Sequence, residues 1–518
     1  MNTILGELGK SKKFVELIKN IEEKQSPIGI SGLSNVGMLE TIASINEYSK
    51  KPIAIITYNE IQAKWIMENI QFFTDKAIYF PKKDIVTYDY VAESKDLPYS
   101  RIEALNKINS KRNYILVTTI EAAMQKLPAK QLLYKNTLKF KVGEIHSLDK
   151  IKQDLLNLGY TRCDLIEGRG QFSLRGGILD ISINDAIGVR VEFWGDEIDS
   201  IRNFNIISQR SINTLEKVEI EPAHEYILEK PIEEICKKVR KTIANDEQEE
   251  IIEQDIEQIK AGNYISKIDK YFDCFYDKQE TIIDYLNTNS IITFDEIRKI
   301  EQRAQNIIKD NEQLIKNLIE KGKVVPQAIS NIQTFSSIEN NTKESEKTII
   351  CIEKQDTKIE RQAQNYNFQY RAINYYKSEI ETLFTDIKKA QEKGKNIYVV
   401  VATKEKAKKL QEILEQENII SKIEEKLDKT IIVKSQEKII TISIGKLSEG
   451  FENYEINQVI ISADELIEGG KKKKTFAHQA YKEGEKVVFA DLKIGDYVVH
   501  KNYGIGIYIG VNTITADG

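Results

Sequence analysis

Short apolar runs alternate with helical segments along the first 120 residues, and this alternation constrains the fold more than any other feature. Strand-like runs occur at 27–30, 53–57, 78–80 and 114–119, and an amphipathic helix at 11–25 precedes them. Runs that are apolar at every position are typical of strands buried on both faces of a parallel sheet, and the intervening segments supply the covering helices. We therefore predict an α/β multidomain protein that begins with a parallel-sheet lobe.

The hydrophobic period changes near residue 137. From there to about residue 222, apolar and polar residues alternate, as they do in half-buried antiparallel strands. In one such strand Leu179, Ile181 and Ile183 fall on one face, with Asp180 and Ser182 on the other. This pattern predicts a smaller β-rich domain inserted into the first lobe.

The remaining sequence returns to α/β character before it ends in turn-rich β sequence. Densely charged helical sequence fills 228–286, and a strand at 290–294 precedes a long helix. The polar stretch Glu339–Lys347 is expected to be a linker or surface loop. A further strand and helix begin at Tyr398–Val401, and a single hairpin is expected within 491–518. Because one hairpin cannot form a stable domain, we expect this chain to be part of a longer protein.

Composition excludes several classes of protein. The 518 residues suffice for about three or four domains. Lysine and arginine number 75 against 80 acidic residues, so the net charge of −5 provides no bulk field for non-specific nucleic-acid binding. The four cysteines and four histidines are scattered without a CxxC pair, which argues against a structural zinc site. No apolar run reaches membrane-spanning length, and we expect a cytoplasmic protein without a membrane partner.

The loop after the first strand carries half of a phosphate-binding motif. That motif has the form GxxxxGK followed by Ser or Thr, with a lysine that neutralises phosphate and a hydroxyl that holds magnesium. Gly32 and Gly37 have the required spacing, but Met38 and Leu39 stand where the lysine and the hydroxyl belong. The glycine spacing alone is a weak signal.

A second fragment of a nucleotide site follows the strand at 290–294. Asp295 and Glu296 end this strand, in the arrangement that supplies a magnesium-holding acid and a water-polarising acid in ATPases. A plain strand end capped by acids explains them equally well. Taken with the glycine loop, they indicate a degenerate nucleotide site without its own cofactor, and we expect no hydrolysis.

Three longer segments carry a family resemblance. Their sequences are EGRGQFSLRGGILDI at Glu167–Ile181, VEFWGDEIDSIR at Val191–Arg202, and LKIGDYVVH followed by YGIGIYIG at Leu492–Gly510. Together they resemble the bacterial transcription-repair coupling factors (Mfd). The first two segments are also similar to the excision-repair protein UvrB, whereas the third resembles an RNA-polymerase-interacting domain.

The resemblance implies a particular domain order. It comprises the first part of a degenerate RecA-like (P-loop NTPase-like) lobe at 1–136, an inserted β-rich UvrA-binding domain at 137–225, the second part of the UvrB-like module at 226–375, an α/β domain of unclear role at 376–470, a linker at 471–488, and the start of a truncated small β-barrel at 489–518. The ATP- and Mg²⁺-dependent DNA translocase of the family would lie outside this chain, and contact with double-stranded DNA would come mainly through it.

The resemblance also implies two partner-binding surfaces. The inserted domain would recruit UvrA through basic residues, with Arg175 as the first candidate and Arg162 and Arg169 beside it; a solvated hairpin arginine explains the latter two equally well. The family commonly has an aromatic residue where Ser182 stands, so the anchor for UvrA would be weaker or different here. The barrel would bind the RNA polymerase β subunit weakly, with Ile514 on its exposed edge or in its core.

The favoured function is therefore an adaptor that couples stalled RNA polymerase to nucleotide excision repair by recruiting UvrA. The alternative is a UvrB-like, ATP-dependent damage-verification protein. Met38 and Leu39 argue against it, as does the segment Tyr88–Ser100, which is short for a strand-separating hairpin. A free-standing nucleotide-dependent hydrolase is a third reading, and micromolar ATP affinity would favour either of these alternatives.

Overall fold

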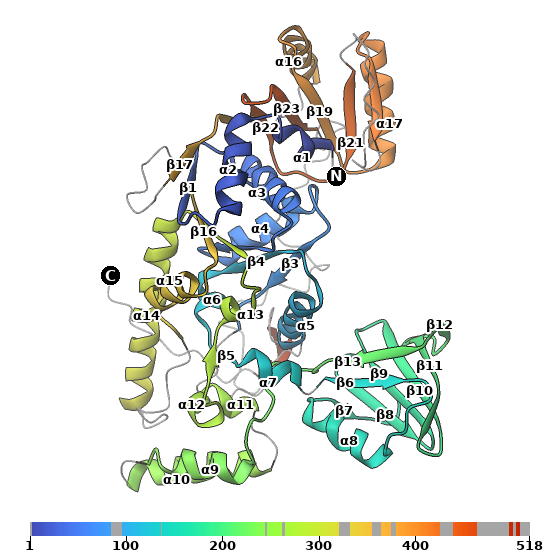
Figure 1. Ribbon diagram of the computed structural model, residues 1–518, viewed down its shortest axis with the longest axis vertical. Coiled ribbons are helices and arrows are strands. Elements are labelled where there is room, and N and C mark those ends of the chain that lie inside the picture. Colours follow the sequence, from blue (N-terminus) through green and yellow to red (C-terminus); the bar gives the residue numbers. More distant parts are fainter. Residues whose placement is uncertain are drawn as a thin grey trace.

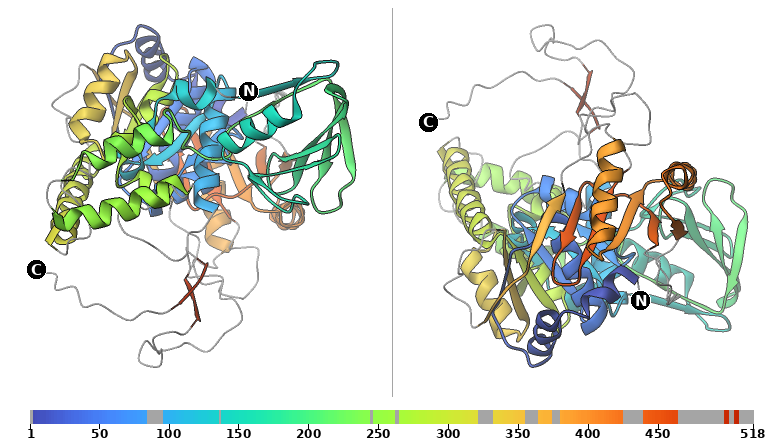
Figure 2. Two further views of the ribbon diagram at one scale, coloured as in Figure 1. Left: turned by 90° about the horizontal axis from the view of Figure 1, so that it is seen from below. Right: turned by 90° about the horizontal axis from the view of Figure 1, so that it is seen from above.

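The computed structural model describes most of the chain and shows a mixed α/β protein with several sheets (Figure 1). The described residues are 3–83, 96–135, 137–243, 246–261, 265–320, 332–354, 364–373, 380–424, 439–463, 497–500 and 504–507. The predicted multidomain α/β class is confirmed. Figure 2 shows that the β-rich part projects to one side of the central lobe.

A seven-stranded parallel sheet forms the central lobe, in the order β17-β1-β16-β15-β2-β4-β3. Its strands are β1 Ile28–Ser31, β2 Ile53–Thr57, β3 Ala77–Phe80, β4 Ile115–Thr119, β15 Ile291–Asp295, β16 Thr348–Glu353 and β17 Gln364–Asn367. Strands from before and after the inserted region therefore form one sheet, in which β1 lies between β17 and β16 and β2 lies beside β15. Every residue of β2, β4, β15 and β16 is buried, as expected for strands covered on both faces.

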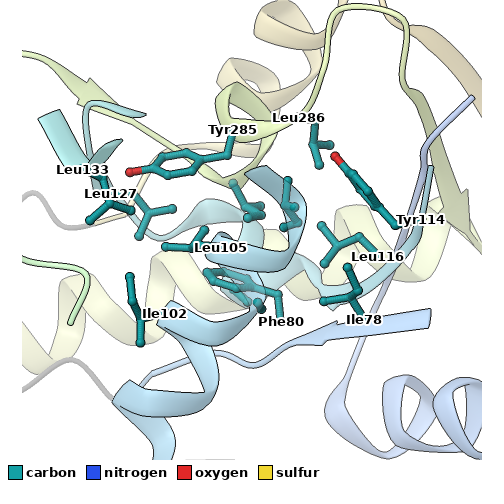
Figure 3. Close-up of a cluster of buried hydrophobic side chains, with 14 of the residues drawn as sticks. Ile78, Phe80, Ile102, Leu105, Tyr114, Leu116, Leu127, Leu133, Tyr285 and Leu286 are labelled. Carbon is teal, nitrogen blue, oxygen red and sulfur yellow. The ribbon is translucent and has the colours of Figure 1, made fainter. Parts of the chain in front are cut away.

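Two layers of helices cover this sheet, because successive residues of each strand face opposite sides. Ile55 points into a core with the first four helices, whereas Ile56 points into a core with the others. The first layer contains α1 Thr3–Leu8, α2 Lys12–Glu22, α3 Asn35–Ser49 and α4 Glu60–Ile70. The second contains α5 Asp96–Ser110, α6 Ile120–Met124, α13 Ile282–Tyr285, α14 Ile297–Glu320 and α15 Phe335–Glu344. Figure 3 shows the part of this second core in which Phe80, Leu105, Leu116 and Tyr285 meet.

The stretch Glu339–Lys347 is not a linker, and the prediction was wrong. Helix α15 extends to Glu344, and β16 begins at Thr348. Ile338 and Thr342, one helical turn apart, are both fully buried, and the Thr334 hydroxyl caps the helix by accepting the Ser337 amide. One buried position per turn is enough to hold this polar segment against the lobe.

The inserted region folds around a six-stranded sheet in the order β12-β11-β10-β9-β8-β7. Its strands are β7 Thr161–Arg162, β8 Gln171–Arg175, β9 Ile178–Ser182, β10 Ile187–Trp194, β11 Glu197–Asn205 and β12 Ser211–Leu215. Helix α8 Leu148–Asn157 buries Ile151 and Leu155 against the inner face of this sheet. A two-stranded ladder, β6 Leu138–Lys141 with β13 Lys217–Ile220, connects the region to the lobe.

Four helices with a separate apolar core lie below the lobe in Figure 1: α9 Ile232–Arg240, α10 Asp246–Lys260, α11 Ile265–Ile268 and α12 Phe272–Phe275. Strand β5 Leu127–Pro128 pairs with β14 Gln279–Glu280, and α7 Lys130–Lys135 follows β5; Leu127 and Leu133 belong to the second core of the lobe. Among the described residues, no helix is both long and apolar enough to span a membrane.

A second six-stranded sheet, in the order β18-β22-β23-β19-β21-β20, follows the lobe. Its elements are β18 Tyr370–Ile373, α16 Ile380–Glu392, β19 Asn396–Val401, α17 Lys404–Gln416, β20 Ser421–Glu424, β21 Ile440–Ile444, β22 Gly450–Asn453 and β23 Gln458–Ser462. Helices α16 and α17 cover one face, while Phe451 and Ile460 on the other face join the core of the lobe. The hairpin β24 Tyr497–His500 with β25 Gly504–Ile507 is the last described element.

Candidate functional site

The loop with the two motif glycines connects β1 to α3, in the strand–loop–helix context that the sequence predicted. Gly32 has a φ of 73°, a left-handed conformation that favours glycine. The Ser34 hydroxyl caps α3 by accepting the Gly37 amide at 3.1 Å. These features place the loop at the carboxyl edge of the parallel sheet, where ligands bind in many α/β proteins.

The chain itself fills the space over this loop. The Phe368 amide donates to the Ser31 carbonyl at 2.9 Å, and the Tyr370 amide donates to the Gly32 carbonyl at 3.0 Å. A Cβ atom on Gly32 would overlap the Phe368 carbonyl, and one on Gly37 would overlap the Tyr370 ring. The close approach of residues 368–370 therefore explains why both positions are glycine, without a phosphate ligand.

The first turn of α3 also faces protein. Met38 and Leu39 are fully buried in the lobe core, so neither occupies a position open to a ligand. Glu40 is fully buried as well, and its Oε2 atom accepts the Tyr370 hydroxyl at 2.8 Å. Burial raises the pKa of Glu40 to about 8. Tyr370 thus connects the loop, α3 and the start of the second sheet.

The two acids at the end of β15, Asp295 within the strand and Glu296 directly after it, lie at the same sheet edge, and protein groups hold them. Asp295 is fully buried; its Oδ2 atom accepts the Thr57 hydroxyl at 3.1 Å and the Gln62 amide at 3.2 Å, and burial raises its pKa. Glu296 has a left-handed φ of 61° and pairs with Lys299 at 2.9 Å and Lys354 at 3.3 Å. Within the described ranges, no group of three or more His, Cys, Asp or Glu side chains is arranged to hold a metal ion.

The outer face of the inserted sheet, opposite α8, carries paired charges centred on Asp180. Asp180 is 1% exposed. Its Oδ1 accepts Arg190 Nε at 2.6 Å, and its Oδ2 accepts Arg190 Nη2 at 2.8 Å and Arg175 Nη2 at 3.1 Å. Arg202 pairs with Glu192 beside them. The Arg175 side chain remains half exposed, although its Nη2 atom is held by the buried Asp180.

The structure separates the three arginines that the sequence singled out. Arg169 is engaged within the chain, because it pairs with Asp185 at 2.7 Å and with Glu103 of α5 at 2.9 Å. Arg162 is exposed on β7, at the edge of the sheet. Sequence reasoning missed Arg190, which lies beside Arg175 on Asp180. Arg190 pairs with Asp180 in the β9–β10 register, so an alignment of these two strands would have placed the two residues opposite each other.

Asp180 and Ser182 lie on the face opposite Leu179 and Ile181, as the alternation predicted, but both are buried there. Ser182 is 2% exposed, and its hydroxyl accepts the Gln171 amide at 3.0 Å. The segment after β7 folds over this part of the outer face, and the Ser173 hydroxyl donates to the Asp164 carbonyl at 2.8 Å. Phe204 is also buried there, beneath the Arg190 guanidinium. Ser182 therefore offers no exposed anchor to a partner.

The predicted residue for polymerase binding, Ile514, lies outside the described residues. The described part of that region is the antiparallel hairpin β24–β25, in which Val499 pairs with Ile505. Ile514 therefore stays a prediction.

These features define a multidomain α/β protein with an inserted β-rich domain whose outer face carries paired charges. Residues 138–226 match the family model described as the UvrB interaction domain, and residues 492–518 match the model described as the CarD-like/TRCF RID domain. The first match differs by one residue at each end from the predicted range 137–225.

The whole chain is similar to proteins named transcription-repair-coupling factor, which confirms the predicted resemblance. It is 27% identical over 536 residues to the protein of Bacillus subtilis, covering 100% of this chain and 45% of the relative. It is 27% identical over 510 residues to that of a Staphylococcus epidermidis strain and 26% over 500 residues to that of a Staphylococcus aureus strain, covering 95% and 94% of this chain and 42% of each relative. The chain thus spans less than half the length of these relatives.

Proposed function

We propose that this chain is the N-terminal part of a transcription-repair coupling factor and serves as an adaptor that recruits UvrA to stalled RNA polymerase. The observation that carries the proposal is the UvrB interaction domain match at 138–226, on a domain whose outer face presents the half-exposed Arg175. The match at 492–518 supports polymerase as the second partner. The UvrB-like alternative is not favoured, because these two matches occur in one chain.

The proposal includes a finer architecture. In it, the seven-stranded lobe is a degenerate RecA-like lobe, and β24–β25 begin a small β-barrel that binds the polymerase β subunit through an edge containing Ile514. The relatives are more than twice as long as the part matched here. We assign ATP, Mg²⁺, translocation and most contact with double-stranded DNA to that remaining length, in a cytoplasmic protein.

Arg175 is suited to binding an acidic partner surface. A guanidinium carries five N–H donors in a planar fork that pairs bidentately with carboxylates. The contact with Asp180 uses Nη2 of Arg175, and half of the side chain is exposed to solvent. Because Asp180 also holds Arg190, the fork is positioned before a partner arrives, which lowers the entropic cost of binding.

Charge reversal at Arg175 tests this function. Titration of UvrA from the same organism into the chain by calorimetry is expected to show binding, and Arg175→Glu is expected to weaken it by about 30-fold or more, as for the loss of a positioned interfacial charge. Arg210→Glu is the matched control, since Arg210 is an exposed arginine elsewhere in the domain. Absence of binding by the folded wild-type chain would refute UvrA recruitment, and equal losses in both variants would refute the role of Arg175.

The chain is expected not to bind ATP. Fluorescent ATP analogues should show no saturable micromolar binding, even for the variant Met38→Lys with Leu39→Thr, which restores the motif side chains. The reason is that residues 368–370 lie against both motif glycines. Far-UV circular dichroism checks that the variant is folded. Micromolar affinity of the wild-type chain would instead support the UvrB-like alternative.

A further inference from the structure

An exposed tryptophan ends the central strand β10 of the inserted sheet. Trp194 is 85% exposed, and Ile178 on the neighbouring strand is 38% exposed. Trp194 pairs with Glu197 across the β10–β11 hairpin, and Glu197 in turn forms a bridge with Ile145, which is 77% exposed. Exposed apolar side chains therefore gather at one end of the sheet, as they do at protein interaction sites.

Trp194 lies on the same face as Arg175. Side chains alternate along a strand, and Phe193 points into the inner core, so Glu192 and Trp194 both face outward. Glu192 pairs with Ile178, which pairs with Arg175. With strands about 4.8 Å apart and a rise of about 3.4 Å per residue, the Cα atoms of Trp194 and Arg175 lie roughly 12 Å apart. One partner surface can span both residues.

The charges around Trp194 differ from those around Asp180. Asp196, Glu197 and Asp199 are exposed acids of the same hairpin, and the part of the chain that the structure describes provides no ion pair for their side chains. The hairpin between Trp194 and Asp199 contains no basic residue. This end of the face therefore carries uncompensated negative charge, whereas Asp180 and Glu192 are neutralised by arginines.

We propose that Trp194, with Asp196 and Glu197, receives a lysine or arginine side chain of UvrA. This inference rests on the proposed function. An indole face is the strongest aromatic partner for a cation, and adjacent carboxylates add to the attraction. The same carboxylates repel phosphate, so this end of the face is better suited to a cationic protein side chain than to a nucleic acid. The basic Arg175 and the acidic, aromatic Trp194 end then require opposite charges on the partner, and this fixes its orientation.

Calorimetric titration of UvrA into single variants tests the inference. Trp194→Ala is expected to weaken binding by about 30-fold, the effect typical of an interfacial tryptophan anchor, and Trp194→Phe by less. Asp196→Lys with Glu197→Lys is expected to weaken binding by at least about 10-fold, through like-charge repulsion with the cation. Ile207→Ala is the matched control, because Ile207 is 88% exposed and lies beyond the opposite end of the strands.

A spectroscopic readout follows the contact directly. The chain contains two tryptophans, and Trp65 donates its indole N–H to Ser448 at 2.9 Å. Fluorotryptophan labelling of this chain therefore gives two fluorine resonances, of which only that of Trp194 should shift when unlabelled UvrA is added. Suppose that the wild-type chain binds UvrA. The inference alone is overturned if Trp194→Ala or the double charge reversal leaves the affinity unchanged, or if the Trp194 resonance does not shift. Absence of wild-type binding overturns the proposed function and the inference together.

Discussion

Replacing Arg101 with methionine is expected to destabilise the junction between the lobe and the inserted domain by about 3–5 kcal/mol, the usual effect of removing one partner from a buried ion pair. Arg101 and Glu225 are 0% and 2% exposed, and Arg101 Nε lies 3.0 Å from each carboxylate oxygen of Glu225. The substitution leaves the Glu225 carboxylate buried without a countercharge. Hydrogen exchange of the α5 amides, read by mass spectrometry, should report the loss as faster opening.

The other contacts of Arg101 make this site more than a single pair. Its Nη1 donates to the Pro81 carbonyl at 2.7 Å and to Gln125 at 3.1 Å, and its guanidinium lies over the Phe80 ring. The arginine thus connects α5 to the end of β3, to the residue after α6 and to the segment after β13. Loss of these contacts leaves buried acceptors without the hydrogen bonds that Arg101 provides.

Two comparisons distinguish the effect of the unpaired buried charge from non-specific destabilisation by a substitution. The double variant Arg101→Met with Glu225→Met removes both charges and should recover much of the loss, because an apolar pair of similar volume can replace a buried ion pair. Arg303→Met is the surface control; Arg303 pairs with Glu121 at 3.1 Å and is 40% exposed, so its loss should cost less than about 1 kcal/mol. Equal effects of Arg101→Met and Arg303→Met would contradict the prediction.

Stability of the lobe is expected to fall as the pH rises from about 5 to about 8, because of Glu40. Its pKa is about 8 in the folded chain against an ordinary value of 4.5, so the folded state holds a proton that the unfolded state has released across this range. Above pH 8 Glu40 is ionised in the folded chain as well, and the loss of folding stability is complete. It amounts to at most about 5 kcal/mol, at about 1.4 kcal/mol per pKa unit.

Glu40→Gln should remove this pH dependence and make the lobe more stable at pH 9 than the wild type. Urea unfolding at pH 5.5, 7 and 9 measures the effect, followed by the emission of Trp65, whose indole donates to Ser448 in the second sheet region. Tyr370→Phe is the second variant. It removes the hydrogen bond to Glu40 that lowers the pKa, so the fall in stability should extend to higher pH. A wild-type profile that is flat between pH 5.5 and 9 would contradict the assignment.

Local periodicity was sufficient to predict the buried strands and the inserted β-rich domain. β2 is apolar at four of its five positions and β4 at three of five because helices cover both faces of the sheet, and this leaves a direct signal in the sequence. The alternation in β9 was also correct for Leu179 and Ile181. It did not extend to Ile183, which lies beyond the end of β9 and is 46% exposed. Nor could it show that Asp180 is buried, because a polar residue in a strand does not reveal that a loop and two arginines will cover it.

Local sequence patterns could not predict which residues meet in the candidate sites, because these contacts join residues that are distant in the sequence. Tyr370 contacts Gly37 and Glu40 across more than 300 residues of sequence, so the loop motif could not show that the chain fills its own site. Arg190 required the register of β9 with β10. The family resemblance located the domain, but it could not distinguish Arg175, which is half exposed, from Arg169, which pairs with two acids.

The β6–β13 ladder has a consequence for how this molecule can change over evolution. Leu138 pairs with Ile220 and Lys141 with Lys217, so the chain leaves and rejoins the lobe on adjacent antiparallel strands, with paired Cα atoms about 5 Å apart. A short turn would bridge this gap. The region between them is therefore a cassette, which recombination can delete, duplicate or exchange between proteins while the seven parallel strands keep their order.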